Sequence, residues 1–161
     1  YLEADLFNAG VRPAINVGIS VSRVGGNAQI KAMKQVAGRL RIDLAQFREL
    51  EAFAKFGTDL DKATQQQLER GKRLVEVLKQ KQYVPQAVEK QVAALFIATQ
   101  GLTDDVPVES IQRFVKEFVA YLEAKKADIL KTVREKKTVD EALGGLIRGA
   151  VDEFKKSGAF A

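Results

Sequence analysis

The sequence contains no cysteine and no histidine among its 161 residues. Without cysteine there is no disulfide framework and no thiol nucleophile, and without histidine there is no imidazole base. A zinc finger is excluded as well, because cysteine and histidine are its ligands. The lack of cysteine is compatible with a reducing compartment but does not demonstrate one. These function classes are therefore set aside.

The sequence also lacks a concentrated charge of one sign. The 26 basic residues outnumber the 21 acidic ones, for a net charge of +5, but the two signs are interspersed along the chain. A nucleic-acid surface needs a concentrated basic patch, so we expect no nucleic-acid partner. No apolar run is long enough to cross a bilayer, and the chain begins at Tyr1 without an initiator Met or a signal-peptide pattern. We expect that an N-terminal part is missing.

Helical periodicity dominates what is present. Hydrophobic residues make up 46% of the chain, which is enough for one core. From Asn27 onward apolar side chains recur at steps of three and four, which favours an all-α bundle of about five helices. Asn27 is the expected N-cap of the first helix, Pro85 the first residue of the third, and Thr138 with Glu141 the capping box of the fifth. The fourth helix is predicted to run unbroken over residues 109–133.

The stretch RPAINVGISVSRVGG, residues 12–26, has a different pattern. Aliphatic and polar residues alternate from Ile15 to Val21, which predicts a short strand that Pro13 begins. The strand would deliver Arg23 just before two glycines, where the backbone can turn sharply or approach another surface. A guanidinium presented in this way suits phosphate oxygens. An ordinary solvated or salt-bridged arginine is the alternative interpretation.

Other chemical motifs are missing from the sequence. No phosphate-binding loop of the form G-x-x-x-x-G-K-[ST] is present, and Gly71 with Lys72 lies inside a predicted helix without the hydroxyl that the motif needs. Paired acidic residues such as Asp104 and Asp105 lack a metal-ligand pattern, and roles in turns or caps account for them. We therefore predict no metal site and no catalytic acid or base.

The run PAINVGISVS resembles a signature of the α and β subunits of rotary ATP synthases. Its continuation, SRVGGNAQIKAMKQVAGRLRIDLAQFRELEAFAKFGTDLDKATQQQLERGKRLVEVLKQKQYVP, is similar to the α subunit of the F-type enzymes. The resemblance covers essentially the whole chain and corresponds to about the last third of such a subunit. It implies that residues 1–28 are the incomplete end of a nucleotide-binding domain and that residues 29–161 form a C-terminal helical bundle domain. Because a strand of a parallel sheet normally needs neighbours, we expect residues 1 to about 26 to be disordered, rearranged or paired with another copy.

The resemblance also implies a catalytic contribution. In this family the active sites lie at subunit boundaries, mostly on the β subunit, and the α subunit contributes one arginine. Arg23 matches that arginine, which would stabilise the charge on the transferred γ-phosphoryl group, an effect of roughly 10³ to 10⁵ in rate in related enzymes. Ser20 matches a signature position and would orient the segment that carries Arg23. We expect both residues to be required for activity.

A second, non-exchanging nucleotide is implied at the opposite boundary of the α subunit. Gln80 and Gln82 match residues that contact its adenine, and Arg12 and Pro13 match residues near the same base. On the residues alone, two glutamines in a polar connector are ordinary solvated side chains. The implied cofactors are ATP or ADP with magnesium. They are expected only in the full complex, because the phosphate loop and the metal ligands lie outside this chain.

The resemblance further implies the partners. The loop FGTDLD, residues 56–61, corresponds to a contact with the rotating γ stalk, although a simple surface turn explains it nearly as well. The full complex would add β subunits and a δ subunit, and would couple ATP synthesis to a proton gradient. Its expected place is the cytoplasmic side of a bacterial plasma membrane, with the mitochondrial inner membrane and plastid membranes also consistent. The isolated chain is expected to have no ATPase activity. A stand-alone helical protein-interaction module without catalysis is the alternative.

Overall fold

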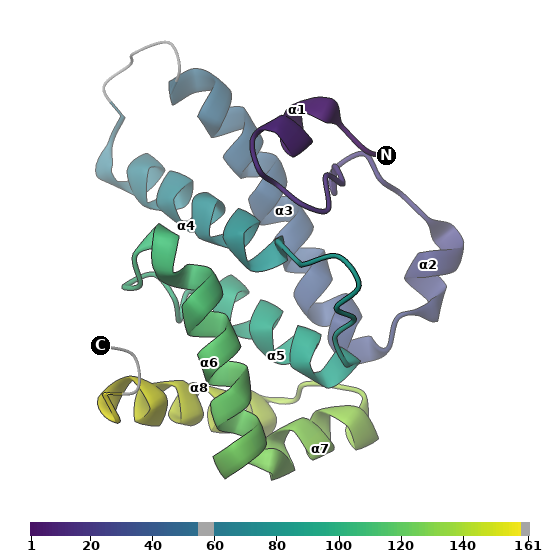
Figure 1. The fold of residues 1–161 in the computed structure, drawn as a ribbon, viewed down its shortest axis with the longest axis vertical. Helices are drawn as coiled ribbons and strands as arrows, with labels where there is room; N and C mark the ends of the chain where they lie inside the picture. Colours follow the sequence, from purple (N-terminus) through teal and green to yellow (C-terminus); the bar gives the residue numbers. More distant parts are fainter. Residues whose placement is uncertain (55–59, 159–161) are drawn as a thin grey trace.

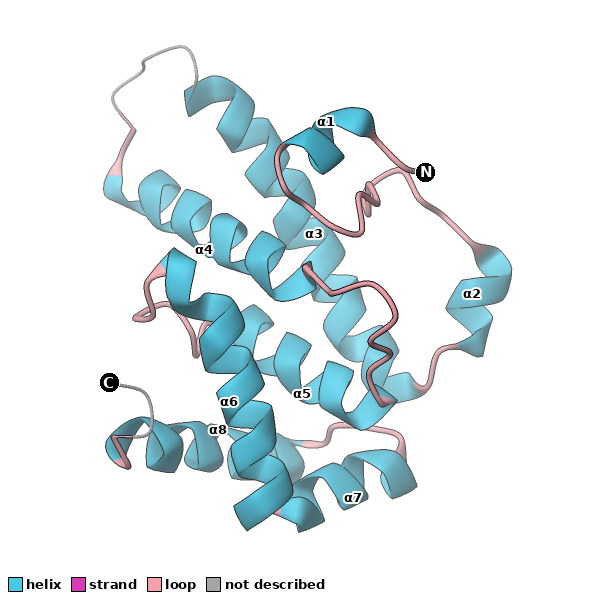
Figure 2. Ribbon diagram, viewed as in Figure 1, coloured by secondary structure: helices cyan, strands magenta, loops and turns pink. Residues whose placement is uncertain are grey.

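The computed structural model describes residues 1–54 and 60–158. Within these residues the chain is helical, as the sequence predicts, and it contains no strand (Figures 1 and 2). The elements are α1 (Ala4–Asn8), α2 (Arg23–Ala28), α3 (Lys31–Ala54), α4 (Lys62–Leu78), α5 (Val88–Thr99), the 3₁₀ helix η1 (Val108–Ser110), α6 (Ile111–Lys125), α7 (Ala127–Lys136) and α8 (Glu141–Lys156). The all-α class is confirmed.

The helices form a bundle in which α3 contacts both α4 and α5 (Figure 1). α6, α7 and α8 make up the other end of the molecule and pack against one another. α1 and the segment after it lie beside α3, whereas α2 stands at the edge of the molecule (Figure 1). The N-terminal region is therefore an addition to the bundle rather than part of its centre.

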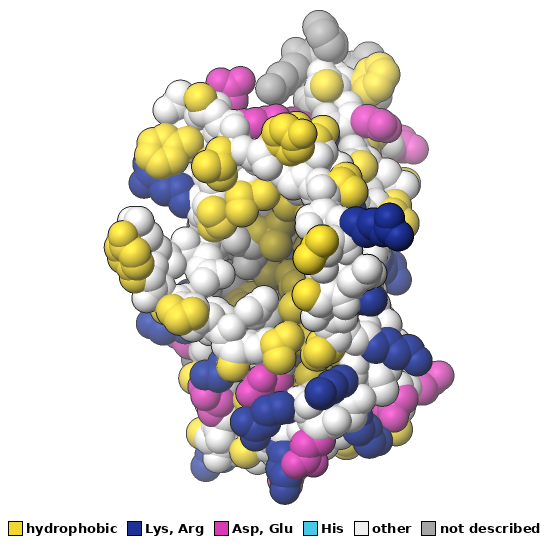
Figure 3. Space-filling model, turned by 90° about the vertical axis from the view of Figure 1, so that its right-hand side faces the viewer, with side chains coloured by type: hydrophobic (Ala, Val, Ile, Leu, Met, Phe, Trp, Pro, Cys, Tyr) yellow, Lys and Arg dark blue, Asp and Glu magenta, His cyan; other side chains and the backbone are white. Residues whose placement is uncertain are grey.

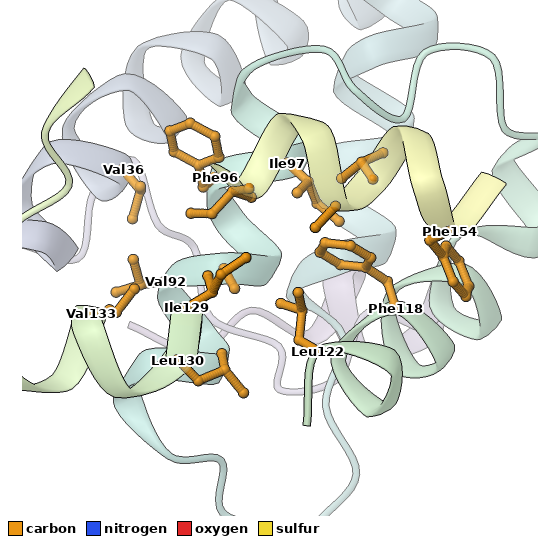
Figure 4. Packing of buried hydrophobic residues seen from close by; sticks show 14 of the residues in the cluster. Val36, Val92, Phe96, Ile97, Phe118, Leu122, Ile129, Leu130, Val133 and Phe154 are labelled. Atoms are coloured by element: carbon orange, nitrogen blue, oxygen red, sulfur yellow. The ribbon is translucent and has the colours of Figure 1, made fainter. Parts of the chain in front are cut away.

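One apolar cluster forms the centre of the bundle, and it draws on α3 and on every helix from α5 to α8 (Figure 4). Four phenylalanine rings lie within it, those of Phe96, Phe114, Phe118 and Phe154. The Phe154 ring meets those of Phe114 and Phe118 edge-on, at centroid distances of 5.4 and 5.7 Å. Such edge-to-face pairs stabilise a core beyond the area they bury. Buried side chains at steps of three and four supply the rest of the cluster, which confirms the helical periodicity on which the fold prediction depended.

The predicted strand over residues 15–21 is wrong. Apart from an isolated antiparallel bridge between Leu2 and Ile15, no β pairing occurs in the described part of the chain. A strand needs a partner for its backbone N–H and C=O groups, and this segment has none along most of its length. Instead the chain turns at Asn16, and Arg23 begins α2 rather than ending a strand.

The fourth predicted helix is in fact two helices. The backbone leaves the helical conformation at Lys126, which has φ −137° and ψ 38°. The Lys126 Nζ atom pairs with Glu153 Oε2 of α8 at 2.8 Å. The bend between α6 and α7 directs Ile129 and Val133 into the main core, where both are buried. An unbroken apolar pattern could not reveal this bend, because both helices keep the same face inward.

Three predicted helix starts are also corrected. Asp140, not Thr138, caps α8: its carboxylate accepts a hydrogen bond of 2.8 Å from the Leu143 N–H. The first long helix begins at Lys31, so Asn27 lies inside α2 and is not its cap. α5 begins at Val88, so Pro85 precedes it instead of opening it.

The turn over residues 101–107 is held from two sides. Arg70 of α4 pairs with Asp104, and the Lys155 Nζ atom of α8 lies 2.6 Å from Asp105 Oδ1. The Asp104 pair raises the pKa of Arg70 above its ordinary value, with the hydrogen bond as the main cause. The two acidic residues thus connect one turn to two helices.

Candidate functional site

The segment before α3 carries four of the six predicted site residues. Its start and middle run beside each other: the Glu3 N–H donates to the Ala14 carbonyl at 2.9 Å, and the Asn16 N–H donates to the Tyr1 carbonyl at 3.0 Å. Leu6 and Ala14 are buried, which holds the segment against the bundle. The predicted site residues on this segment are Arg12, Pro13, Ser20 and Arg23.

Arg23 is the first residue of α2. The helix start is fixed by Ser22, whose hydroxyl accepts a hydrogen bond of 2.9 Å from the Gly25 N–H. The Arg23 side chain is exposed, and within residues 1–54 and 60–158 no carboxylate pairs with it. Gly25 and Gly26 lie inside α2 and make no sharp turn there. The geometry therefore presents a guanidinium to the surroundings from a defined helix start.

Ser20 lies in the segment that leads to Arg23 and is half-buried. Its hydroxyl accepts a hydrogen bond of 2.9 Å from the amino group of Tyr1. Its own N–H donates to the Asn16 carbonyl at 3.0 Å. Ser20 thus contributes to the fold of this segment. Neither of the two Ser20 hydrogen bonds involves the Arg23 guanidinium.

The structure brings Arg12 and Gln80 together. The Gln80 N–H donates to the Arg12 carbonyl at 2.9 Å, which joins the N-terminal segment to the connector after α4. The Gln80 side chain folds over that connector, because its Nε2 donates to the Val84 carbonyl at 2.7 Å. In the part of the chain that the structure describes, its Oε1 accepts no hydrogen bond and is available as an acceptor. Gln82 is exposed in the same connector, next to Tyr83 with its left-handed backbone (φ 61°).

Phe7 contacts Arg12, a role that the sequence did not predict. The Arg12 guanidinium lies over the Phe7 ring, 4.2 Å from its centroid. Such stacking fixes the plane of a guanidinium that solvent would otherwise leave free. The signal in the sequence was only an aromatic residue five positions before an arginine, which does not predict a stack.

An apolar hollow of about 180 Å³ separates the N-terminal segment from α3 and α4. Its walls include Pro13, Val17, Leu44, Val75 and Leu78. Figure 3 shows this face of the molecule, with apolar side chains around a hollow. Exposed large apolar residues are concentrated in the same region: Tyr1, Leu2, Phe7, Ile15, Ile19, Val21, Val24, Tyr83 and Val84.

Other candidate sites are limited. Among the described residues, no group of three or more acidic side chains is arranged to hold a metal ion. None of the described helices has both the length and the apolar character that a membrane span requires. Of the predicted stalk-contact loop, residues 56–59 lie outside the described residues. Asp61, at its end, caps α4; hydrogen bonds from Thr64 hold the pKa of this carboxyl below its usual value.

Comparison with known proteins identifies the family. Residues 29–154 match the model of the ATP synthase alpha/beta chain, C-terminal domain. The chain belongs to this family. The prediction of an ATP synthase helical C-terminal domain is therefore confirmed, and the matched residues include every helix from α3 to α7 and most of α8.

A relative indicates the type of chain within the ATP synthase family. The protein is 64% identical over 156 residues to the ATP synthase subunit alpha of Aquifex aeolicus (strain VF5). The alignment covers 97% of this chain and 31% of the relative, so the chain spans about a third of the relative's length. This identity supports the predicted α-subunit type. The roles of individual residues and the domain boundary at residue 28 remain predictions.

Proposed function

We propose that this chain is the C-terminal part of an ATP synthase alpha subunit and that it supplies Arg23 to a catalytic site built mostly by a neighbouring beta subunit. The observation that carries the proposal is the exposed Arg23 guanidinium at a capped helix start, in a chain 64% identical to a subunit alpha. Residues 1–28 would be the end of the nucleotide-binding domain and residues 29–161 the C-terminal helical domain.

The physical reason for an arginine lies in the transition state. Negative charge on the transferred γ-phosphoryl group spreads over its equatorial oxygens, and a guanidinium can donate to two of them at once. Because Arg23 forms no ion pair with the described residues 1–54 and 60–158, it would enter such a site without first breaking a salt bridge to them. Ser20 would keep the segment before Arg23 in place, through the hydrogen bond between its N–H and the Asn16 carbonyl.

The second proposed site binds the adenine of a non-exchanging nucleotide. Arg12, Pro13, Gln80 and Gln82 would surround the base, with the Phe7 ring behind the Arg12 guanidinium. Because Gln80 Nε2 donates to the Val84 carbonyl, its Oε1 is left to accept from the exocyclic amino group of adenine. ATP or ADP would bring magnesium with it. The phosphate loop and the metal ligands would come from parts of the subunit outside this chain.

The proposed partners are those of the complete complex: beta subunits beside the alpha subunit, the gamma stalk at the 56–61 loop, and a delta subunit. The complex would make ATP with the energy of a proton gradient, at the cytoplasmic side of a bacterial plasma membrane. The chain by itself would not hydrolyse ATP, since it contains no loop that could grip a triphosphate.

The proposal is tested in the full-length subunit assembled with its beta and gamma partners. Arg23→Ala should lower kcat roughly 10³-fold or more and leave nucleotide binding intact, and Arg23→Lys should recover little of it. Arg41→Ala removes another exposed arginine, on α3, and is the matched control. Unchanged turnover in Arg23→Ala would remove the catalytic role and favour a helical interaction module without catalysis.

A further inference from the structure

We propose that Asn16 is a positioning residue for Arg23: its side chain fixes the turn that directs the chain into the start of α2. This inference rests on the proposed role of Arg23. The segment from Asn16 to Ser22 contains no helix, and within the described residues it forms no strand ladder. Something other than regular secondary structure must therefore hold it.

The Asn16 carboxamide makes the contacts that regular structure would otherwise supply. Its Oδ1 accepts hydrogen bonds from the Gly18 N–H at 3.0 Å and, more weakly, from the Ile19 N–H at 3.4 Å. Its Nδ2 donates to Glu3 Oε1 at 2.8 Å. Asn16 also accepts the Ser20 N–H with its own carbonyl at 3.0 Å. One residue thus closes the turn and ties it to the start of the segment.

The turn is fixed to the helical bundle as well. Val17 packs against the small cluster formed by Leu40, Leu44, Leu74 and Ala98 of α3, α4 and α5. Because Asn16 and Val17 are adjacent, the bundle holds one side of the turn and Glu3 holds the other. The orientation of the turn is therefore set by contacts on both sides.

Only Val21 and Ser22 separate this turn from Arg23. Ser22 is extended, with φ −132° and ψ 116°, and its hydroxyl caps α2 through the Gly25 N–H. Because this link is short and extended and α2 is capped, a change in the direction of the turn would also move Arg23, the first residue of the helix. A displacement of about 1 Å at a catalytic group can cost about 100-fold in rate.

The test uses the full-length subunit assembled with its partners. Asn16→Ala should lower kcat by about 10- to 100-fold with KM unchanged. Asn16→Asp keeps the acceptor for the Gly18 N–H but replaces the donation to Glu3 by two facing carboxylates, so kcat should fall in this variant as well. Asn8→Ala, which truncates an exposed asparagine of α1, is the matched control and should leave kcat unchanged.

A double-substitution cycle separates positioning from a general structural role. If Asn16 acts through Arg23, Asn16→Ala should cause no further loss of kcat in an Arg23→Ala background. Additive losses would overturn the inference, as would an unchanged kcat in Asn16→Ala alone. If Asn16→Ala does not assemble, the same cycle with Asn16→Asp decides, and failure of both to assemble would show a structural role only. Unchanged turnover in Arg23→Ala would instead overturn the proposed function itself.

Discussion

Replacing Gly71 by alanine should destabilise the protein, although alanine is the better helix former. Gly71 is buried on α4 and faces Phe47 of α3. A Cβ atom at this position would lie 2.2 Å from Phe47 Cδ2, 2.3 Å from Cγ and 2.5 Å from Cβ. Carbon atoms in contact normally lie about 3.5–4.0 Å apart. Rotation of the Phe47 ring cannot relieve the clash, because the Phe47 Cβ atom is part of it.

Two opposing effects determine the size of the change. Alanine in a helix interior is about 1 kcal/mol more favourable than glycine, whereas overpacking a core costs about 1–3 kcal/mol and occasionally more. Since three Phe47 atoms lie inside contact distance, the upper end of that range applies. The expected net loss is about 2 kcal/mol of unfolding free energy. For a chain of this size that corresponds to a fall of about 4–8 °C in Tm.

Urea and thermal unfolding followed by far-UV circular dichroism measure this difference. Gly38→Ala is the matched control, because Gly38 lies inside α3 with no atom within 4 Å of the Cβ position. It should raise the unfolding free energy by about 0.5–1 kcal/mol. The same substitution thus has opposite expected signs at two helical sites. A Gly71→Ala protein at least as stable as the unsubstituted chain would refute the packing argument.

Three further predictions follow from contacts elsewhere in the fold. The Gln35 amide accepts a hydrogen bond from the Val139 N–H at 3.0 Å and donates one to the Val139 carbonyl at 3.2 Å. Glutamate cannot donate, so Gln35→Glu should lower the free energy of unfolding in urea by about 0.5–1.5 kcal/mol; equal stability would contradict this. Ile97→Ala should cost about 2–5 kcal/mol by the same assay, since Ile97 is fully buried. Asp140→Ala should lower Tm at pH 7 through loss of the α8 cap. The hydrogen bond from the Leu143 N–H, and then Lys136, lower the pKa of Asp140 in the folded protein. The stability that Asp140 contributes is therefore complete above the pKa of this group in the unfolded chain, and it disappears as the pH falls through the pKa in the folded protein. A Tm difference between Asp140→Ala and the parent that persists under strongly acidic conditions would argue against this.

The sequence predicted the helices well where a single apolar face points to one core. The periodicity that carries α3, α5 and α8 is present in the sequence and in the burial pattern alike. Helix ends were less predictable. The Thr138–Glu141 spacing fits a capping box, yet Asp140 caps α8 because Thr138 lies against Gln35 of α3. Such a contact between residues far apart in the chain leaves no local signal.

The candidate site also contains features that the sequence could not predict. Alternation from Ile15 to Val21 is typical of a strand, but the Asn16 side chain satisfies backbone N–H groups locally and forms a turn instead. The stack of Phe7 and Arg12 depends on how the segment folds back and so was not predictable. The resemblance pointed to Arg23 without specifying that it opens a helix.

The turn over residues 101–107 has a mechanical consequence. Arg70 of α4 and Lys155 of α8 form ion pairs with Asp104 and Asp105 of that turn. A displacement of one helix is therefore transmitted to the other through these two ionic contacts. Substitution of Asp104 or Asp105 would therefore remove one of the two ionic contacts through which this turn joins α4 to α8.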